Sequence, residues 1–156
     1  MAVLKILKFG EEALRKTARP VEEITPRIKT LLDDMIETMR AAGGCGLAAP
    51  QVGVLRRIAV IEVEDGVVYE LINPKIIAYA GEQQESEGCL SNPGEYGITK
   101  RPKAVTVRAT DRYGKEYELS GTDLLARAIC HECDHLDGKL YTDVQIRPYT
   151  AEERRK

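Results

Sequence analysis

The stretch TDLLARAICHECDHLDG, residues 122–138, predicts a helix that organises the rest of the chain. Thr122 or Asp123 can cap its start, and Gly138 can supply the left-handed residue that ends it. Four side chains recur at spacings of four, three and four residues and therefore share one face, which we expect to turn toward the interior. They are Leu124, Ala128, His131 and His135.

The segment HECDH, residues 131–135, has the pattern H-E-x-x-H within this helix. Because His131 and His135 stand one turn apart, both imidazoles can reach one metal ion while Glu132 contacts a metal-bound water. The alternative is a solvated helix face with two surface histidines. It is weakened because the chain holds only 2 His and both lie in this pattern. We therefore expect a metal site.

A catalytic metal of this kind usually keeps three protein ligands, so one more is needed. Downstream, Asp143, Glu152 and Glu153 are available, but the last two lie in a charged tail. Upstream, EGCLSNPG (residues 87–94) places Cys89 in a turn-forming context between strands, where a thiolate can be presented to a metal. We take Cys89 as the third ligand; a buried, inert thiol is the alternative.

The loop GGCGLAAPQ, residues 43–51, is rich in small residues that allow another backbone to approach closely. A peptide could lie beside this segment as an added strand. The loop lacks the Lys of a phosphate-binding loop, which disfavours nucleotide binding. Gln51 carries an amide that can donate a hydrogen bond to a developing oxyanion. A helix end followed by a tightly packed loop explains the same residues equally well.

The chain of 156 residues is expected to be a single domain, residues 1–156, with a frayed C-terminal tail over residues 147–156. Hydrophobic residues make up 43% and charged residues 31%, which excludes a disordered or membrane protein. The net charge of -2, without a basic block, argues against a nucleic-acid-binding surface. Residues 1–10 fall short of a signal peptide, so we expect a cytoplasmic protein, in which the 4 Cys serve thiol chemistry, metal ligation or burial.

The remaining patterns predict an α+β fold. Residues 26–39 form an amphipathic helix, with Thr25 as its N-cap and Pro26 at the first position. Residues 11–16 indicate a weaker helical piece, which Pro20 closes. The β-branched runs 58–63 and 67–72 flank a Glu-Asp-Gly turn, and further strands are indicated at 75–80, 104–109 and 116–119. We expect antiparallel strands packed around the C-terminal metal-binding helix, together with the N-terminal amphipathic helix.

Three motifs stand in order: GCGLAAPQ (44–51), EGCLS (87–91) and HECDHL (131–136). In this combination the chain closely resembles peptide deformylase, whose signature motifs are G-x-G-L-A-A-x-Q, E-G-C-L-S and H-E-x-D-H-L. The resemblance covers nearly the whole chain. It implies a hydrolase of protein biosynthesis that processes the N-terminal methionine, removing the N-formyl group of new polypeptides and releasing formate.

The resemblance also implies the metal chemistry. Cys89, His131 and His135 correspond to the ligands of one divalent ion, with Fe²⁺ expected natively and Zn²⁺, Ni²⁺ or Co²⁺ as substitutes. Glu132 corresponds to the general base that takes a proton from the metal-bound water and passes it to the leaving amine. A soft ligand set that includes a thiolate suits these ions better than Mg²⁺ or Ca²⁺.

The substrate contacts follow from the same resemblance. Gln51 and the backbone N–H of Leu90 would stabilise the tetrahedral oxyanion. The backbone of Gly44, Cys45 and Gly46 would pair with the substrate peptide, and the helix before the histidines would line a pocket for the methionine side chain. The implied partners are formyl-Met nascent peptides, and the ribosome near its exit tunnel is a further candidate; neither nucleic acid nor membrane is expected to be bound directly.

Some residues depart from the family pattern or extend it. Cys130 and Cys133 are not expected to be ligands, because one precedes the histidine pair and the other lies on a different helix face. Tyr96 lies in a stretch of the groove that differs among family members. Glu87 and Arg101 are placed to form a charge-assisted pair that fixes the Cys89 turn, with solvated surface charges as the alternative.

Two other classes of protein share part of this pattern. A small H-E-x-x-H metalloprotease would need a downstream Glu, Asp or His ligand in place of Cys89. An inactive metal-binding or ribosome-associated module has no support, because every catalytic position matches the family.

Overall fold

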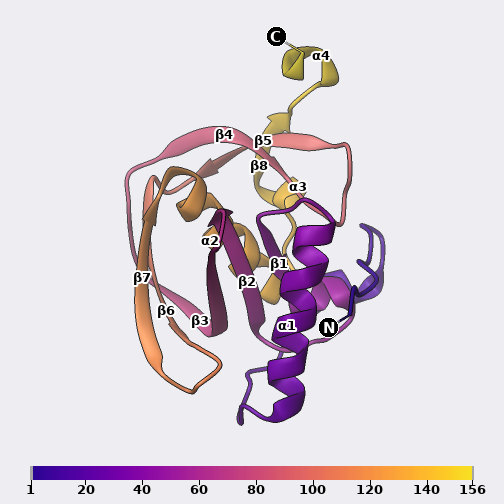
Figure 1. Cartoon of the computed structure of the whole chain (residues 1–156). Coiled ribbons are helices and arrows are strands. Elements are labelled where there is room, and N and C mark those ends of the chain that lie inside the picture. The colour runs from indigo at the N-terminus through magenta and orange to yellow at the C-terminus, as the bar shows by residue number, and fades with distance from the viewer. Residues whose placement is uncertain (1, 156) are drawn as a thin grey trace.

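The structure is a computed structural model that describes residues 2–155 (Figure 1). Its helices are the 3₁₀ turns η1 (Glu12–Arg15) and η2 (Ala49–Val52) and the α-helices α1 (Pro26–Ala41), α2 (Asp123–Leu136), α3 (Tyr141–Val144) and α4 (Ala151–Arg154). Its strands are β1 (Gly46–Ala48), β2 (Ile58–Glu64), β3 (Val67–Ala80), β4 (Gln83–Gly88), β5 (Tyr96–Arg101), β6 (Ala104–Thr110), β7 (Glu116–Thr122) and β8 (Gln145–Pro148). The strands form two sheets, ordered β1-β2-β3-β6-β7 and β4-β5-β8, with antiparallel pairing throughout. The predicted α+β class is confirmed.

The five-stranded sheet is covered by a different long helix on each face. Side chains of a strand alternate between faces, and β2 sends Ala59 and Ile61 into the cluster that contains Ile129 of α2. Ile58 and Val60 of the same strand point to the opposite face and join the cluster that contains the buried residues of α1. The apolar run of β2 is therefore explained by burial on both faces.

The predicted first helix is confirmed as α1. The Oγ1 of Thr25 accepts a hydrogen bond from the backbone N–H of Ile28 at 3.3 Å, as an N-cap does. The weaker piece at 11–16 is the short 3₁₀ turn η1. Thr122 occupies the N-cap position of α2 without a side-chain hydrogen bond, and α2 ends before Gly138, whose φ is 74°.

The strands differ from the prediction in three places. The separate strands expected at 67–72 and 75–80 are one long strand, β3, with irregular register between Ile72 and Lys75 opposite β6. The whole smaller sheet was missed, because β4 reads QQESEG and carries no alternating apolar residues. β1 was missed as well, within the segment expected to be a loop.

The C-terminal residues expected to fray carry two elements. β8 pairs with β5, matching Gly97 with Pro148 and Ile98 with Arg147. After β8 the chain forms α4, which stands at the top of Figure 1. The Oγ1 of Thr150 caps α4 by accepting a hydrogen bond from the N–H of Glu153 at 3.2 Å. Within residues 2–155, no helix is both long and apolar enough to cross a lipid bilayer.

Candidate metal centre and substrate pocket

Two elements that are distant in sequence bring three donor side chains together. α2 carries His131 and His135, and the residue directly after β4 is Cys89. Their donor atoms lie within 4.8 Å of one another, and the Sγ of Cys89 is 3.3 Å from the Nε2 of His135. Both histidines are buried, and the cysteine is half-buried. The structure thus assembles the three residues selected as ligands from the sequence.

Glu87 fixes the orientation of the first histidine. Its Oε2 lies 2.5 Å from the Nδ1 of His131, which leaves the Nε2 of that ring for the donor cluster. The predicted pair of Glu87 with Arg101 is confirmed, and it is buried. The Nε of Arg101 donates to the Oε1 of Glu87 at 3.1 Å, and its Nη2 donates to the Oε2 at 2.8 Å. Thr99 completes the shell by donating to Oε1 at 2.8 Å. Burial opposes ionisation, but the hydrogen bonds from His131 and Arg101 prevail and lower the pKa of Glu87 to about 2.

Arg101 also links Glu87 to α2. Its Nη1 donates to the Oδ2 of Asp134 at 2.6 Å, so the guanidinium bridges two carboxylates from different elements. Asp134 lies between the donor histidines in sequence, and β5 carries the arginine. One cation therefore links β4, β5 and the helix of the histidines.

Glu132 is buried next to the donor cluster. Its Oε1 has no hydrogen-bond partner among the described residues, although it is a strongly polar atom. Burial, with Glu87 nearby, raises the pKa of Glu132 to about 7. A Cβ at Gly46 would collide with Oε2 of Glu132, so the start of β1 packs closely on this carboxylate. Only glycine permits that approach.

Gln51, on η2, presents its amide group to the same centre. Its Oε1 accepts a hydrogen bond from the N–H of Ala48 at 2.9 Å, which fixes the direction of the NH₂ group. The Nε2 then lies 3.5 Å from the Sγ of Cys89 and 3.1 Å from the Oγ of Ser91. The side chain is a buried donor held in one orientation beside the candidate metal centre.

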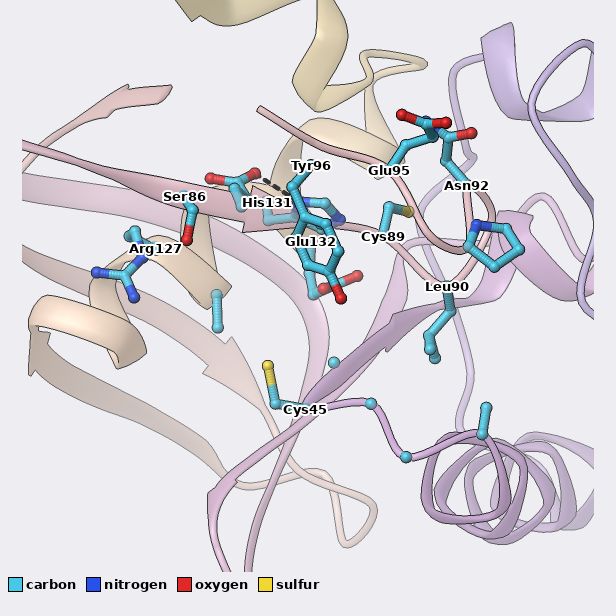
Figure 2. Close-up of a pocket in the computed structure, with 18 of the residues that line it drawn as sticks. Cys45, Ser86, Cys89, Leu90, Asn92, Glu95, Tyr96, Arg127, His131 and Glu132 are labelled. Atoms are coloured by element: carbon cyan, nitrogen blue, oxygen red, sulfur yellow. Dashed lines mark hydrogen bonds and ion pairs between the residues drawn. The ribbon is translucent and has the colours of Figure 1, made fainter. Parts of the chain in front are cut away.

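A cavity of about 550 Å³ opens beside these groups (Figure 2). Gly44, Cys45 and Gly46 line one side of it, and Leu90 lines it next to Cys89. β1 is an edge strand: it pairs with β2 on one side only, and the Cys45 carbonyl accepts the N–H of Glu62 at 2.8 Å. The edge of β1 that faces away from β2, together with the preceding residues 44 and 45, can therefore pair with an extended peptide.

α2 contributes a further wall of the cavity through Leu124, Arg127 and Ala128. The expectation that the whole helix face turns inward is correct for Ala128 and for both histidines, but wrong for Leu124. That side chain is 43% exposed, because it stands on the first turn of α2, at the mouth of the cavity.

The residues excluded as ligands lie outside the donor cluster. Within residues 2–155, the group of donor atoms includes neither Cys130 nor Cys133. Asp143, considered downstream, pairs with Arg15 at 2.5 Å, and Glu153 pairs with Arg147 at 2.7 Å.

Three features of the site were not inferred from the sequence. The first is the hydrogen bond between Glu87 and His131, because the glutamate was assigned only to Arg101. The second is the contact of Ser91 with Gln51. The third is Tyr141, which is buried and whose hydroxyl oxygen accepts a hydrogen bond from the Nδ2 of Asn92 at 3.0 Å. Glu87 and Ser91 both belong to the EGCLS motif, whereas no sequence signal indicates Tyr141.

The donor set fits a divalent transition ion. It consists of one sulfur and two imidazole nitrogens, which suit Fe²⁺ or Zn²⁺ and not Mg²⁺ or Ca²⁺. The carboxylate on the Nδ1 of His131 is the outer partner that metal-ligating histidines usually have. The unpartnered Oε1 of Glu132 adds a polar acceptor beside the donors.

Comparisons with known proteins agree on one family. The family described as "Polypeptide deformylase" matches residues 3–150 of this chain. The chain is 54% identical over 154 residues to a peptide deformylase of Thermoanaerobacter pseudethanolicus, covering 99% of this chain and 96% of that protein. It is 58% identical over 147 residues to one of Acetivibrio thermocellus, covering 94% and 86%.

Solved structures show the same similarity. A peptide deformylase from Legionella pneumophila superposes with a TM-score of 0.90 at 43% identity, covering 99% of this chain and 90% of that one. A peptide deformylase from Synechococcus elongatus in complex with actinonin has a TM-score of 0.88 at 40% identity, covering 96% and 83%.

Proposed function

The chain belongs to the polypeptide deformylase family, whose enzymes are metal-dependent, and we propose that it hydrolyses the N-formyl group of formyl-Met nascent peptides. The products are formate and a free methionine amine. The observation that carries this proposal is the convergence of Cys89, His131 and His135 at a cavity beside the buried Glu132. The same proposal includes a cytoplasmic location, where nascent chains carry the formyl group, and keeps the ribosome near its exit tunnel as a candidate partner.

Cys89, His131 and His135 would hold one divalent ion, with Fe²⁺ as the native ion and Zn²⁺, Ni²⁺ or Co²⁺ as substitutes. When bound, the ion supplies Lewis-acid polarisation of the formyl carbonyl and lowers the pKa of water. Glu87 keeps the Nε2 of His131 directed at the ion by holding the opposite ring nitrogen.

Glu132 moves the proton. Its carboxylate takes a proton from the attacking water, whose oxygen forms the new bond to the formyl carbon. The C–N bond then breaks as Glu132 returns this proton to the nitrogen, which gives the free amine and formic acid; the acid then loses its remaining water-derived proton and leaves as formate. The close packing of Gly46 holds the carboxylate in place for both transfers.

Gln51 and the N–H of Leu90 would stabilise the oxyanion that forms between these steps. The Nε2 of Gln51 is fixed by the Ala48 contact before substrate arrives, so no reorganisation is needed during the reaction. The substrate backbone would pair with Gly44, Cys45 and Gly46 at the free edge. The methionine side chain would occupy the part of the cavity lined by α2.

Formate release from a short formyl-Met peptide tests the function directly. Protein purified without oxygen, with its metal content measured, should release formate. The activity should disappear on chelation and return with Fe²⁺ or Ni²⁺. Absence of release from fully metallated, folded protein would contradict the proposal.

A C89A variant separates this function from that of a metalloprotease. We expect metal binding to be lost, because one of three ligands is removed. Retained metal stoichiometry would favour a protease with a different third ligand.

A further inference from the structure

The C-terminal helix α4 reaches back to a wall of the substrate cavity. The guanidinium of Arg154 lies over the ring of Tyr96, with its carbon 4.5 Å from the ring centroid. Its Nη1 also donates to the carbonyl of Gly94 at 2.9 Å. Tyr96, Gly94 and the neighbouring Glu95 all line the cavity. One side chain therefore joins the end of the chain to the loop that precedes β5.

The ring of Tyr96 is held from a second direction by β4. A Cβ at Gly88 would lie 2.8 Å from the Cε1 and 2.9 Å from the Cδ1 of Tyr96, so the ring packs directly on that glycine. Gly88 precedes Cys89, the sulfur donor of the candidate metal centre. The tyrosine ring therefore packs on the residue next to Cys89 and forms part of the cavity wall beside the candidate metal centre.

The segment that carries Arg154 is itself anchored. β8 pairs with β5, and the N–H of Tyr149 donates to the carbonyl of Tyr96 at 2.9 Å. Beyond it, α4 is capped by Thr150 and tied by the ion pair of Arg147 with Glu153. These contacts hold the Arg154 guanidinium over the ring of Tyr96.

Tyr96 faces the edge at which a peptide would bind. In Figure 2, Tyr96 and Cys45 lie on opposite sides of the cavity. A peptide that pairs with the 44–46 edge therefore passes between that edge and the tyrosine ring. Tyr96 is 39% exposed, so the residue is accessible to such a peptide.

We propose that Arg154 is a positioning residue for substrate binding: it holds Tyr96 as the wall that contacts the substrate residues following formyl-Met. This inference rests on the proposed function. It assigns α4 to recognition of the peptide beyond its first residue and leaves hydrolysis to the groups around Cys89.

Steady-state kinetics of R154A, with R155A as the matched control, test the assignment. Both variants remove one exposed positive charge from the same end of the chain. For a formyl-Met tripeptide, R154A should raise KM about two- to fivefold, the factor expected for one exposed cation–π contact, while kcat stays within about twofold. R155A should change neither constant, and R154K should restore part of the loss. Equal effects of R154A and R155A, or a fall in kcat alone, would overturn the assignment.

A double-mutant comparison asks whether Arg154 acts through Tyr96. In a Y96L background, R154A should have no further effect on KM, because the ring that it positions is gone. Additive effects of the two substitutions would contradict the proposed route.

Hydrogen exchange supplies a readout that needs no turnover. R154A should speed amide exchange over residues 94–97, and R155A should not. Unchanged protection in R154A would overturn the proposal. If the wild-type protein released no formate, the proposed function would fail, while this comparison would still decide whether Arg154 holds the Tyr96 loop.

Discussion

The Oε2 of Glu87 lies 2.5 Å from the Nδ1 of His131, and both groups are buried. The glutamate is the penultimate residue of β4, a polar strand of the small sheet, and the histidine stands on α2. The contact sets the ring nitrogen that faces the donor cluster, and Arg101 holds the glutamate from the other side.

Replacing this glutamate should weaken metal binding without unfolding the protein. In E87Q, one carboxylate oxygen becomes an NH₂ group, which accepts no hydrogen bond, so Arg101 and His131 can no longer both be satisfied by this side chain. We expect about 10- to 100-fold lower metal affinity, the usual cost of losing such a partner. Metal titration against a competing chelator measures it. E85Q, an exposed position on the same strand, is the control, and equal affinities in the two variants would contradict the role.

Loss of Arg101 should destabilise the fold. R101A leaves Glu87 buried without its cation and removes the link to Asp134, so we expect a loss of about 3–5 kcal/mol in the free energy of unfolding. Chemical denaturation measures the loss. K100A is the control: its pair with Glu82 is exposed, and such pairs contribute at most about 1 kcal/mol. A similar small loss in both variants would show that the buried pair is not structurally important.

Removal of the proton carrier should separate turnover from metal binding. E132Q keeps the shape of the side chain but cannot accept the proton, so kcat should fall by about 10²- to 10⁴-fold while metal content is unchanged. Formate release and metal analysis on the same sample check both parts. Near-native kcat would rule out the general-base role.

Gly46, the first residue of β1, should be needed for catalysis. In G46A, the new Cβ would collide with Oε2 of Glu132 and would lie 3.0 Å from its Cδ and 3.3 Å from its Cγ, so the whole carboxyl group would have to move. We expect the carboxylate to shift and kcat to fall by about 10²-fold, as for a misplacement near 1 Å. Thermal unfolding should be compared with the wild-type protein. Unchanged kcat with intact structure would show that the close approach has no catalytic role.

Glu62 should contribute stability that depends on pH. It accepts two hydrogen bonds from Arg40, at 2.8 and 3.0 Å, and one from the N–H of Gly66, and these lower the pKa of Glu62 from its ordinary value. A lowered folded-state pKa means that the contribution is present above the unfolded value and is lost as pH falls through the folded value. E62Q should therefore lower stability at pH 7 more than at acidic pH.

Denaturation midpoints of E62Q at several pH values check this dependence. E64Q, at an exposed position on the same strand, is the control and should show no such difference. A loss in E62Q that is the same at every pH would contradict the ionic contribution.

The sequence by itself determined the elements whose stabilising contacts are local or periodic. α1 follows from its apolar spacing and the Thr25 cap, and the hairpin of β2 and β3 follows from β-branched runs around a turn. His131 and His135 share a helix face through spacing alone. The turn context of Cys89 and the amide of Gln51 marked both residues as site candidates, the family motifs agreed, and the structure brings them to the same centre.

Only the tertiary structure decided the features that depend on distant partners. The polar strand β4 exists because its backbone pairs with β5, which no side-chain pattern reveals. Glu87 was assigned to Arg101 from its position, but its contact with His131 requires β4 to lie beside α2. The C-terminal residues were expected to fray because they are charged; the pairing of β8 with β5 and the contact of Arg154 with Tyr96 are features that the local sequence does not indicate. Such contacts depend on which surfaces meet in space, and local composition does not encode that information.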